Sequence, residues 1–116
     1  MKKALIVALT LLLVSLTAFA EPFAQKGDNS RVLQGRVTDR QDSPLPNAVV
    51  YLSNTRTRAV KTYIVGQDGT YRFPSLSPNI DYEVYAQYNG HKTDTKTVSQ
   101  FDNRPQVNIN LKIDTR

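Results

Sequence analysis

The sequence offers few residues from which a catalytic or metal site could be assembled. His91 is the only histidine, and cysteine is absent. A catalytic zinc site usually takes three protein ligands, with histidine prominent among them, so the chain does not supply a typical set. The lack of cysteine also excludes disulfides and thiolate chemistry. Because His91 directly follows an Asn-Gly pair, we expect a solvated strand residue there rather than a ligand.

Three aspartates near turns carry oxygen ligands of the kind that calcium prefers. Asp39 and Asp42 share one loop, and Asp68 lies in another. Calcium-binding loops concentrate many oxygen ligands in one short segment, and this spacing does not do so. Aspartate in a turn also accepts hydrogen bonds from nearby backbone amides. We therefore expect turn capping at these positions, and the sequence predicts no catalytic residue, metal or cofactor.

Aromatic and polar side chains provide the best candidate for a ligand surface. Tyr51 and Tyr85 are expected on the outward faces of their strands, with Arg72 and Gln87 as candidate neighbours. Exposed tyrosine beside such groups can bind carbohydrate, since sugar C–H groups stack on the ring and polar groups bind the hydroxyls. The alternative is that tyrosine serves only as a strand former with a wet hydroxyl. The absence of tryptophan weakens the carbohydrate hypothesis.

Short strands are the elements that must position these residues. Polar and apolar residues alternate with a period of two, β-branched and aromatic residues are common, and turn formers separate the runs. The expected strands are 31–38, 48–53, 60–65, 71–73, 82–88, 91–98 and 107–113. Asn89-Gly90 predicts a tight hairpin. Seven short strands without a helical period predict an all-β fold, a seven-stranded antiparallel sandwich of two sheets.

The segment GQDGTYRFPSL contains both charged residues and the clearest turn signal of its region. Its Asp-Gly pair predicts a turn in which Asp68 caps backbone amides and the glycine takes a positive φ. Tyr71 and Phe73 then fall on one face of the next strand, which we expect to be the core. Pro74 lacks a backbone donor and should end this strand. The segment therefore predicts a structural role rather than a catalytic one.

The first twenty residues have the features of a secretory signal peptide. A basic start precedes an apolar run, and Ala18-Phe19-Ala20 supplies small residues for cleavage after Ala20. The predicted organisation is a signal peptide at 1–20, a flexible lead-in at 21–30 and a β-sandwich domain at 31–114. No membrane span is expected after cleavage. The predicted location is periplasmic or extracellular.

The net charge is a weak guide to partners. Loss of the two lysines near the start lowers the basic count from 15 to 13 against 10 acidic residues, so the formal charge falls from +5 to +3. Such a mild charge on a secreted domain permits anionic envelope polymers without selecting them. Nucleic acid is not an expected partner in that compartment.

Four motifs in order resemble the carboxypeptidase regulatory-like domain family, a transthyretin-like β-sandwich, also described as carbohydrate-binding-like. They are Gly35-Arg36-Val37-Thr38-Asp39, the stretch from Pro44 to Val50, Asp68-Gly69-Thr70-Tyr71-Arg72-Phe73 with Leu76, and Tyr82-Glu83-Val84. The resemblance covers roughly residues 31–114. It implies a non-catalytic module that also occurs as a free-standing secreted domain, and it implies no single ligand.

Two alternatives suggested by related sandwiches are disfavoured. A transthyretin-like hydrolase would have several histidines and a Tyr-Arg-Gly-Ser ending, neither of which is present. A Lys–Asn isopeptide bond could use Asn108 or Asn110, but the first strand carries Arg31 and Arg36 instead of lysine. The expected function is a secreted or periplasmic module for protein or envelope interaction, with carbohydrate binding through exposed Tyr and Arg as the alternative. Partner and oligomeric state are left open.

Overall fold

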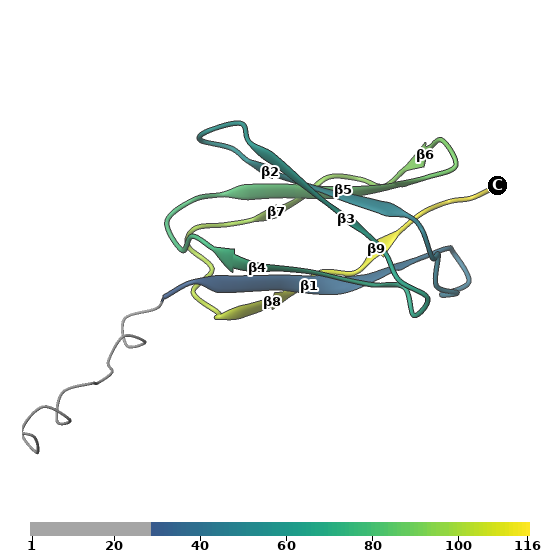
Figure 1. Cartoon of the computed structure of the whole chain (residues 1–116), viewed down its shortest axis with the longest axis horizontal. Helices are drawn as coiled ribbons and strands as arrows, with labels where there is room; N and C mark the ends of the chain where they lie inside the picture. Colours follow the sequence, from purple (N-terminus) through teal and green to yellow (C-terminus); the bar gives the residue numbers. More distant parts are fainter. Residues whose placement is uncertain (1–28) are drawn as a thin grey trace, which may run out of the picture.

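The structure, a computed structural model, describes residues 29–116, whose regular elements are all β-strands (Figure 1). The strands are β1 (Arg31–Thr38), β2 (Val49–Asn54), β3 (Val60–Ile64), β4 (Thr70–Leu76), β5 (Tyr82–Tyr88), β6 (His91–Lys92), β7 (Lys96–Val98), β8 (Gln106–Asn108) and β9 (Leu111–Lys112). The predicted signal peptide and most of the lead-in lie outside the described residues and stay predictions. In the described part of the chain, no helix is long and apolar enough to cross a membrane.

The strands form two sheets that lie face to face (Figure 1). The five-stranded sheet has the order β3-β2-β5, and both β6 and β7 pair with the far side of β5. The four-stranded sheet has the order β4-β1, with β8 and β9 both on the far side of β1. The predicted all-β, two-sheet sandwich is confirmed.

The strands differ from the sequence-based expectation at three places. The prediction that Pro74 ends its strand is wrong, because β4 continues through Pro74 to Leu76. Proline is tolerated here because β4 is an edge strand and its pairing with β1 is irregular between Arg31 and Leu33. β8 and β9 run parallel to β1, whereas the other strand pairs are antiparallel. The predicted strands 91–98 and 107–113 are each divided into two short pieces. Divided edge strands offer less continuous backbone for unwanted pairing with other molecules, so the division suits their edge position.

The core lies between the sheets and contains alternate residues of the strands, among them Tyr71 and Phe73 as predicted. Its buried members include Leu33, Val37, Val50, Leu52, Tyr71, Phe73, Leu76, Val84, Ala86, Val98, Val107, Leu111 and Ile113. The Asp-Gly turn before β4 is also as predicted. Gly69 has a φ of 80°, and Asp68 Oδ1 accepts hydrogen bonds from the Thr70 N–H and hydroxyl at 3.1 and 2.8 Å. Both hydrogen bonds lower the pKa of Asp68, and the bond from the Thr70 hydroxyl has the larger effect.

A buried arginine joins three segments at one end of the sandwich. Arg31 is only 2% exposed, and its guanidinium donates to four backbone carbonyls. Nη1 donates to Ser99 and Asp102 at 2.7 and 3.0 Å, and Nη2 donates to Ser77 and Ile80 at 2.9 and 3.0 Å. The start of β1 is thereby connected to the loop after β4 and to the loop after β7. The carbonyl oxygens take the place of a carboxylate as acceptors for this buried charge.

An interruption between β8 and β9 brings a backbone carbonyl against β1. In a regular parallel ladder the Ile109 carbonyl would accept from the Arg36 N–H. Instead, Asn110 Oδ1 accepts from that N–H at 2.9 Å, and the Ile109 carbonyl accepts from the Tyr71 hydroxyl at 2.7 Å. The redirected carbonyl leaves no room for a side chain on Gly35, because an added Cβ would lie 1.8 Å from its oxygen. The glycine is therefore required by this close approach.

Replacing Tyr71 with phenylalanine tests the hydroxyl contact. At neutral pH we expect a loss of about 1 kcal/mol in the free energy of unfolding, because the Ile109 carbonyl loses its donor. Burial raises the pKa of Tyr71. The stability that the neutral hydroxyl provides is therefore complete below pH ~10 and declines as the pH rises above that value. In urea titrations, the advantage of the wild type over Tyr71→Phe should shrink at alkaline pH, and a constant difference would contradict this account.

Candidate functional site

The outer face of the five-stranded sheet carries both predicted ligand-surface tyrosines side by side. Tyr51 on β2 and Tyr85 on β5 are direct cross-strand partners. Their half-buried rings stack with centroids 4.9 Å apart and an interplanar angle of 14°. Gln87 lies further along β5 on the same face, opposite Val49. The structure thus brings together three of the four residues that the sequence predicted.

The stacked arrangement limits what the Tyr85 ring can bind. Tyr51 covers one side of the ring, and the Lys92 ammonium lies 4.5 Å from the ring centroid. Because β2 and β6 pair with opposite sides of β5, these two groups cover opposite faces of the ring. Both faces of Tyr85 are therefore occupied within the protein, and neither is open for a sugar ring.

Exposed aliphatic residues of β3 extend this face toward the edge of the sheet. Every residue of β3 is exposed, and Val60 and Ile64 are 56% and 67% exposed. Ile64 pairs with Val49, which places it on the same face as Tyr51. We call the outer surface formed by Val49, Tyr51, Val60, Ile64 and Tyr85 the tyrosine face. Residues 60–65 were predicted as a strand, but none of them is among the four predicted ligand-surface residues. The alternation of Val60, Thr62 and Ile64 in VKTYI was the available signal.

Arg72 does not join the tyrosines, and the prediction that it neighbours them is wrong. It lies on β4, which pairs with β1 in the other sheet, opposite Gln34. Its side chain faces out of the four-stranded sheet because the adjacent Tyr71 and Phe73 face the core. Strand alternation correctly predicted that Arg72 is exposed, but it could not assign β4 to a sheet.

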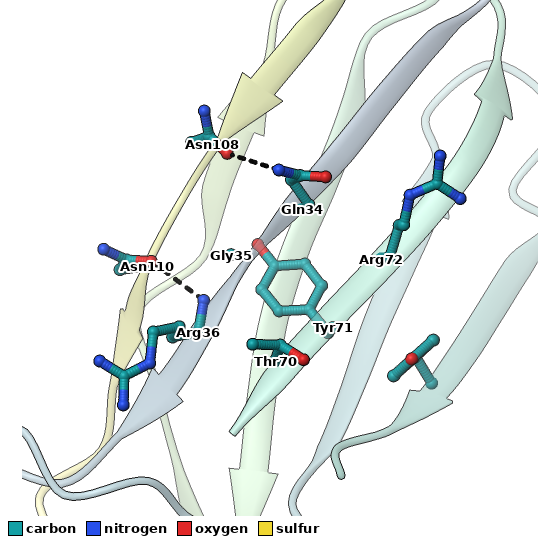
Figure 2. Close-up of a pocket in the computed structure, with 9 residues that line it drawn as sticks. Gln34, Gly35, Arg36, Thr70, Tyr71, Arg72, Asn108 and Asn110 are labelled. Atoms are coloured by element: carbon teal, nitrogen blue, oxygen red, sulfur yellow. Dashed lines mark hydrogen bonds between the residues drawn. The ribbon is translucent and has the colours of Figure 1, made fainter. Parts of the chain in front are cut away.

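Arg72 instead belongs to a second surface, which Figure 2 shows in close-up. An open depression of about 510 Å³ lies over the outer face of the four-stranded sheet. Its outward-facing polar side chains come from β1, β4 and the β8–β9 segment, and we call this set the arginine face. It consists of Gln34, Arg36, Thr70, Arg72, Asn108 and Asn110. Tyr63 of β3 lines one side of the depression.

The arginine face is built in two cross-strand rows. In the first, Gln34 lies between Arg72 and Asn108, and its Nε2 donates to Asn108 Oδ1 at 3.2 Å. In the second, Arg36 lies opposite Thr70, and its backbone N–H donates to Asn110 (Figure 2). Both asparagines face outward and are exposed. The two rows form a polar surface of amide, hydroxyl and guanidinium groups. They contain no pair of side chains that could act as nucleophile and general base.

The aspartates considered as calcium ligands have other partners. Asp39 Oδ1 accepts from the backbone N–H groups of Gln41 and Ser43, both at 2.9 Å, as expected for a turn cap. The Asp42 carboxylate lies 2.9 Å from Lys112 Nζ. Among residues 29–116, no group of three or more His, Cys, Asp or Glu side chains lies close enough together to hold a metal ion.

The two packed sheets and their exposed outer faces define the chain as a β-sandwich domain. The model of the carboxypeptidase regulatory-like domain family matches residues 32–112, and the chain belongs to this family. The resemblance inferred from the four sequence motifs is thereby confirmed. A search of curated protein sequences gives no significant match.

Solved structures with a similar fold come from proteins of different kinds. Catechol 1,2-dioxygenase from Acinetobacter sp. ADP1 matches with a TM-score of 0.57 and 13% identity, over 81% of this chain and 55% of the enzyme. The major pilin subunit BcpA of Bacillus cereus matches with a TM-score of 0.58 and 13% identity, over 75% of this chain and 30% of the pilin. The dioxygenase domain of a dioxygenase–carbohydrate-binding fusion protein from Streptomyces sp. SirexAA-E matches with a TM-score of 0.56 and 15% identity, over 82% of this chain and 86% of that domain. At these identities the likeness shows the fold alone.

Proposed function

We propose that this chain is a non-catalytic interaction module that acts outside the cytoplasm and binds a protein partner through the tyrosine face. The observation that carries the proposal is the exposure of Val60 and Ile64 beside the stacked Tyr51–Tyr85 pair. Contiguous exposed apolar surface next to aromatic side chains is typical of protein interfaces. The predicted signal peptide supports the extracytoplasmic location, and the family resemblance supports a non-catalytic role.

The free edge of β3 gives the same surface a second means of binding. Among the strands that the structure describes, β3 pairs with β2 only, and the Val65 N–H donates to the Ala48 carbonyl at 2.9 Å. Backbone groups alternate in direction along an antiparallel strand, so those of Val60, Thr62 and Ile64 point toward the free edge. An extended segment of a partner could add to this edge by main-chain hydrogen bonds while its side chains cover the tyrosine face.

A protein partner accounts for the tyrosine face better than carbohydrate does. Sugar recognition combines an open aromatic ring with polar groups placed for hydroxyls. Here both faces of the Tyr85 ring are covered, and the exposed neighbours on β3 include the aliphatic Val60 and Ile64. Glycan binding through these tyrosines is therefore the less well supported alternative.

Replacing Ile64 with aspartate should abolish recovery of the partner. The substitution places a charge within the proposed interface, where burial without a counter-ion costs several kcal/mol. Phe101→Asp is a matched control, because Phe101 is also an exposed apolar residue, at 86%, but lies in the loop after β7. The measurement is affinity purification from the native cells with quantitative mass spectrometry. If both variants lose the partner equally, or if only the Phe101 variant loses it, the proposal that the tyrosine face binds the partner would be contradicted.

A further inference from the structure

The arginine face has two exposed cations that form no salt bridge within residues 29–116. Asp68 lies near this face, because its pKa is lowered by the hydrogen bonds from Thr70 and also by the charge of Arg36. Arg36 on β1 and Arg72 on β4 are exposed, and they are diagonal neighbours because Gln34 pairs with Arg72 and Arg36 pairs with Thr70. Within the described part of the chain, no acidic side chain lines the depression between them. Neither guanidinium forms an ion pair or hydrogen bond with another residue of the described chain, 29–116. Arg40, Arg104 and Lys112 each pair with an aspartate, whereas Arg56 and Lys96, like Arg36 and Arg72, form no salt bridge within residues 29–116.

The remaining groups of this face suit hydroxyl recognition. Asn108 and Asn110 use their side-chain oxygens to accept from Gln34 and from the Arg36 backbone, so their amide N–H groups remain available to a ligand. Thr70 donates its hydroxyl proton to Asp68, which leaves the oxygen's lone pairs free to accept. Amide donors and hydroxyl acceptors are thus interspersed with the guanidinium groups.

We propose that the arginine face binds an acidic polysaccharide, with ligand carboxylates on Arg36 and Arg72 and ligand hydroxyls on the amide and threonine groups between them. Guanidinium groups bind carboxylates through charge-assisted, often bidentate hydrogen bonds. The depression of about 510 Å³ is within the usual size of ligand sites and is open. It can therefore accept a section of an extended polymer.

Two other polyanions fit the same face less well. Nucleic-acid binding normally relies on several phosphate contacts, and this face offers two cations. An acidic peptide would satisfy the guanidinium groups, but its backbone carbonyl and N–H groups point alternately to opposite sides of an extended chain, so fewer of them reach the amide and hydroxyl groups of the face. The ligand class therefore combines carboxylates with a high density of hydroxyls. The inference does not depend on the proposed protein partner, which uses the opposite face of the sandwich.

Isothermal titration of the purified chain with polygalacturonate tests the proposal. We expect binding at low salt, with affinity falling by at least about tenfold in the double variant Arg36→Gln/Arg72→Gln. Arg56→Gln/Lys96→Gln is the matched control. It removes the same charge from exposed positions away from the depression, so its affinity should change by less than about twofold. The melting temperatures of both double variants should stay within about 4 °C of the wild type.

Three further titrants distinguish the ligand chemistry. Dextran carries hydroxyls without carboxylates, poly-L-glutamate carries carboxylates without sugar hydroxyls, and duplex DNA carries phosphates. We expect each to bind at least about tenfold more weakly than polygalacturonate. Binding of any of them with equal or higher affinity would overturn the proposed ligand class. An equal loss in both double variants, or no binding of polygalacturonate to the wild type at about millimolar uronate, would overturn the proposed site.

Discussion

Alanine at position 35 is expected to destabilise the domain by about 3 kcal/mol. The new Cβ would lie 1.8 Å from the Ile109 carbonyl oxygen and 3.1 Å from Cε1 of Tyr71. Because the nearer obstacle is backbone, β1 and the β8–β9 segment must separate. The Ile109 carbonyl is then displaced from the Tyr71 hydroxyl. Overpacking typically costs about 1–3 kcal/mol, and the disturbed hydrogen bond about 1 kcal/mol more.

Thermal unfolding followed by circular dichroism measures this effect. For a domain of this size the loss corresponds to a fall of roughly 10–20 °C in the melting temperature. Gly66→Ala is the matched control, because the nearest atom to a Cβ there is Asp68 Oδ1 at an ordinary 3.7 Å. Its melting temperature should change by no more than about 5 °C. Equal effects of the two substitutions would show that the close approach of Ile109 to β1 is not what requires Gly35.

The second large effect is expected for Arg31. Methionine at this position keeps most of the side-chain volume but removes the donors for four backbone carbonyls at one end of the sandwich. Hydrogen bonds to a charged group contribute about 1.5–3 kcal/mol each, but methionine also removes the cost of burying the charge, and water can reach some of the freed carbonyls. We therefore expect Arg31→Met to lower the free energy of unfolding by roughly 3–4 kcal/mol. Urea denaturation of the purified chain gives this value.

Two further variants show whether the hydrogen bonds or the charge matter. Arg31→Lys retains the charge but has three donors on one nitrogen, so it cannot reproduce the fork that spans four carbonyls. It should recover less than half of the lost stability. Arg56→Met is the control, because exposed Arg56 donates to a single carbonyl, that of Asn79, at 3.1 Å. It should cost no more than about 0.5 kcal/mol. A full rescue by lysine would assign the effect to charge alone.

The architecture could be predicted because strand alternation and turn chemistry are local properties. Tyr71 and Phe73 reach the core, as the period of two after the Asp-Gly turn predicts. Asn89 and Gly90 both have positive φ, at 49° and 81°, as their hairpin requires. Each of these features depends on residues within a few positions of one another, and the sequence contains all of them.

The surfaces could not be assigned in the same way because they depend on which strands become neighbours. Arg72 and Tyr85 are both exposed strand residues, yet they lie on opposite sheets because β4 pairs with β1 and β5 pairs with β2. The stacking of Lys92 on Tyr85 likewise follows from a tertiary contact. Arg31 has the same parity as Leu33, which predicts an inward direction. The four carbonyls that accept from its guanidinium, however, belong to loops that are distant in the sequence, so its partners could not be predicted.

The proposed partner site on the tyrosine face is tested most directly by photocrosslinking in living cells. A photoreactive amino acid is placed at Thr62, an exposed residue of β3 on this face, and separately at Lys112, an exposed residue of β9 in the other sheet. After irradiation, we expect the Thr62 position to give a covalent adduct with one defined protein and the Lys112 position to give none. An adduct at Lys112 without one at Thr62, or no adduct at either position, would contradict the proposed function.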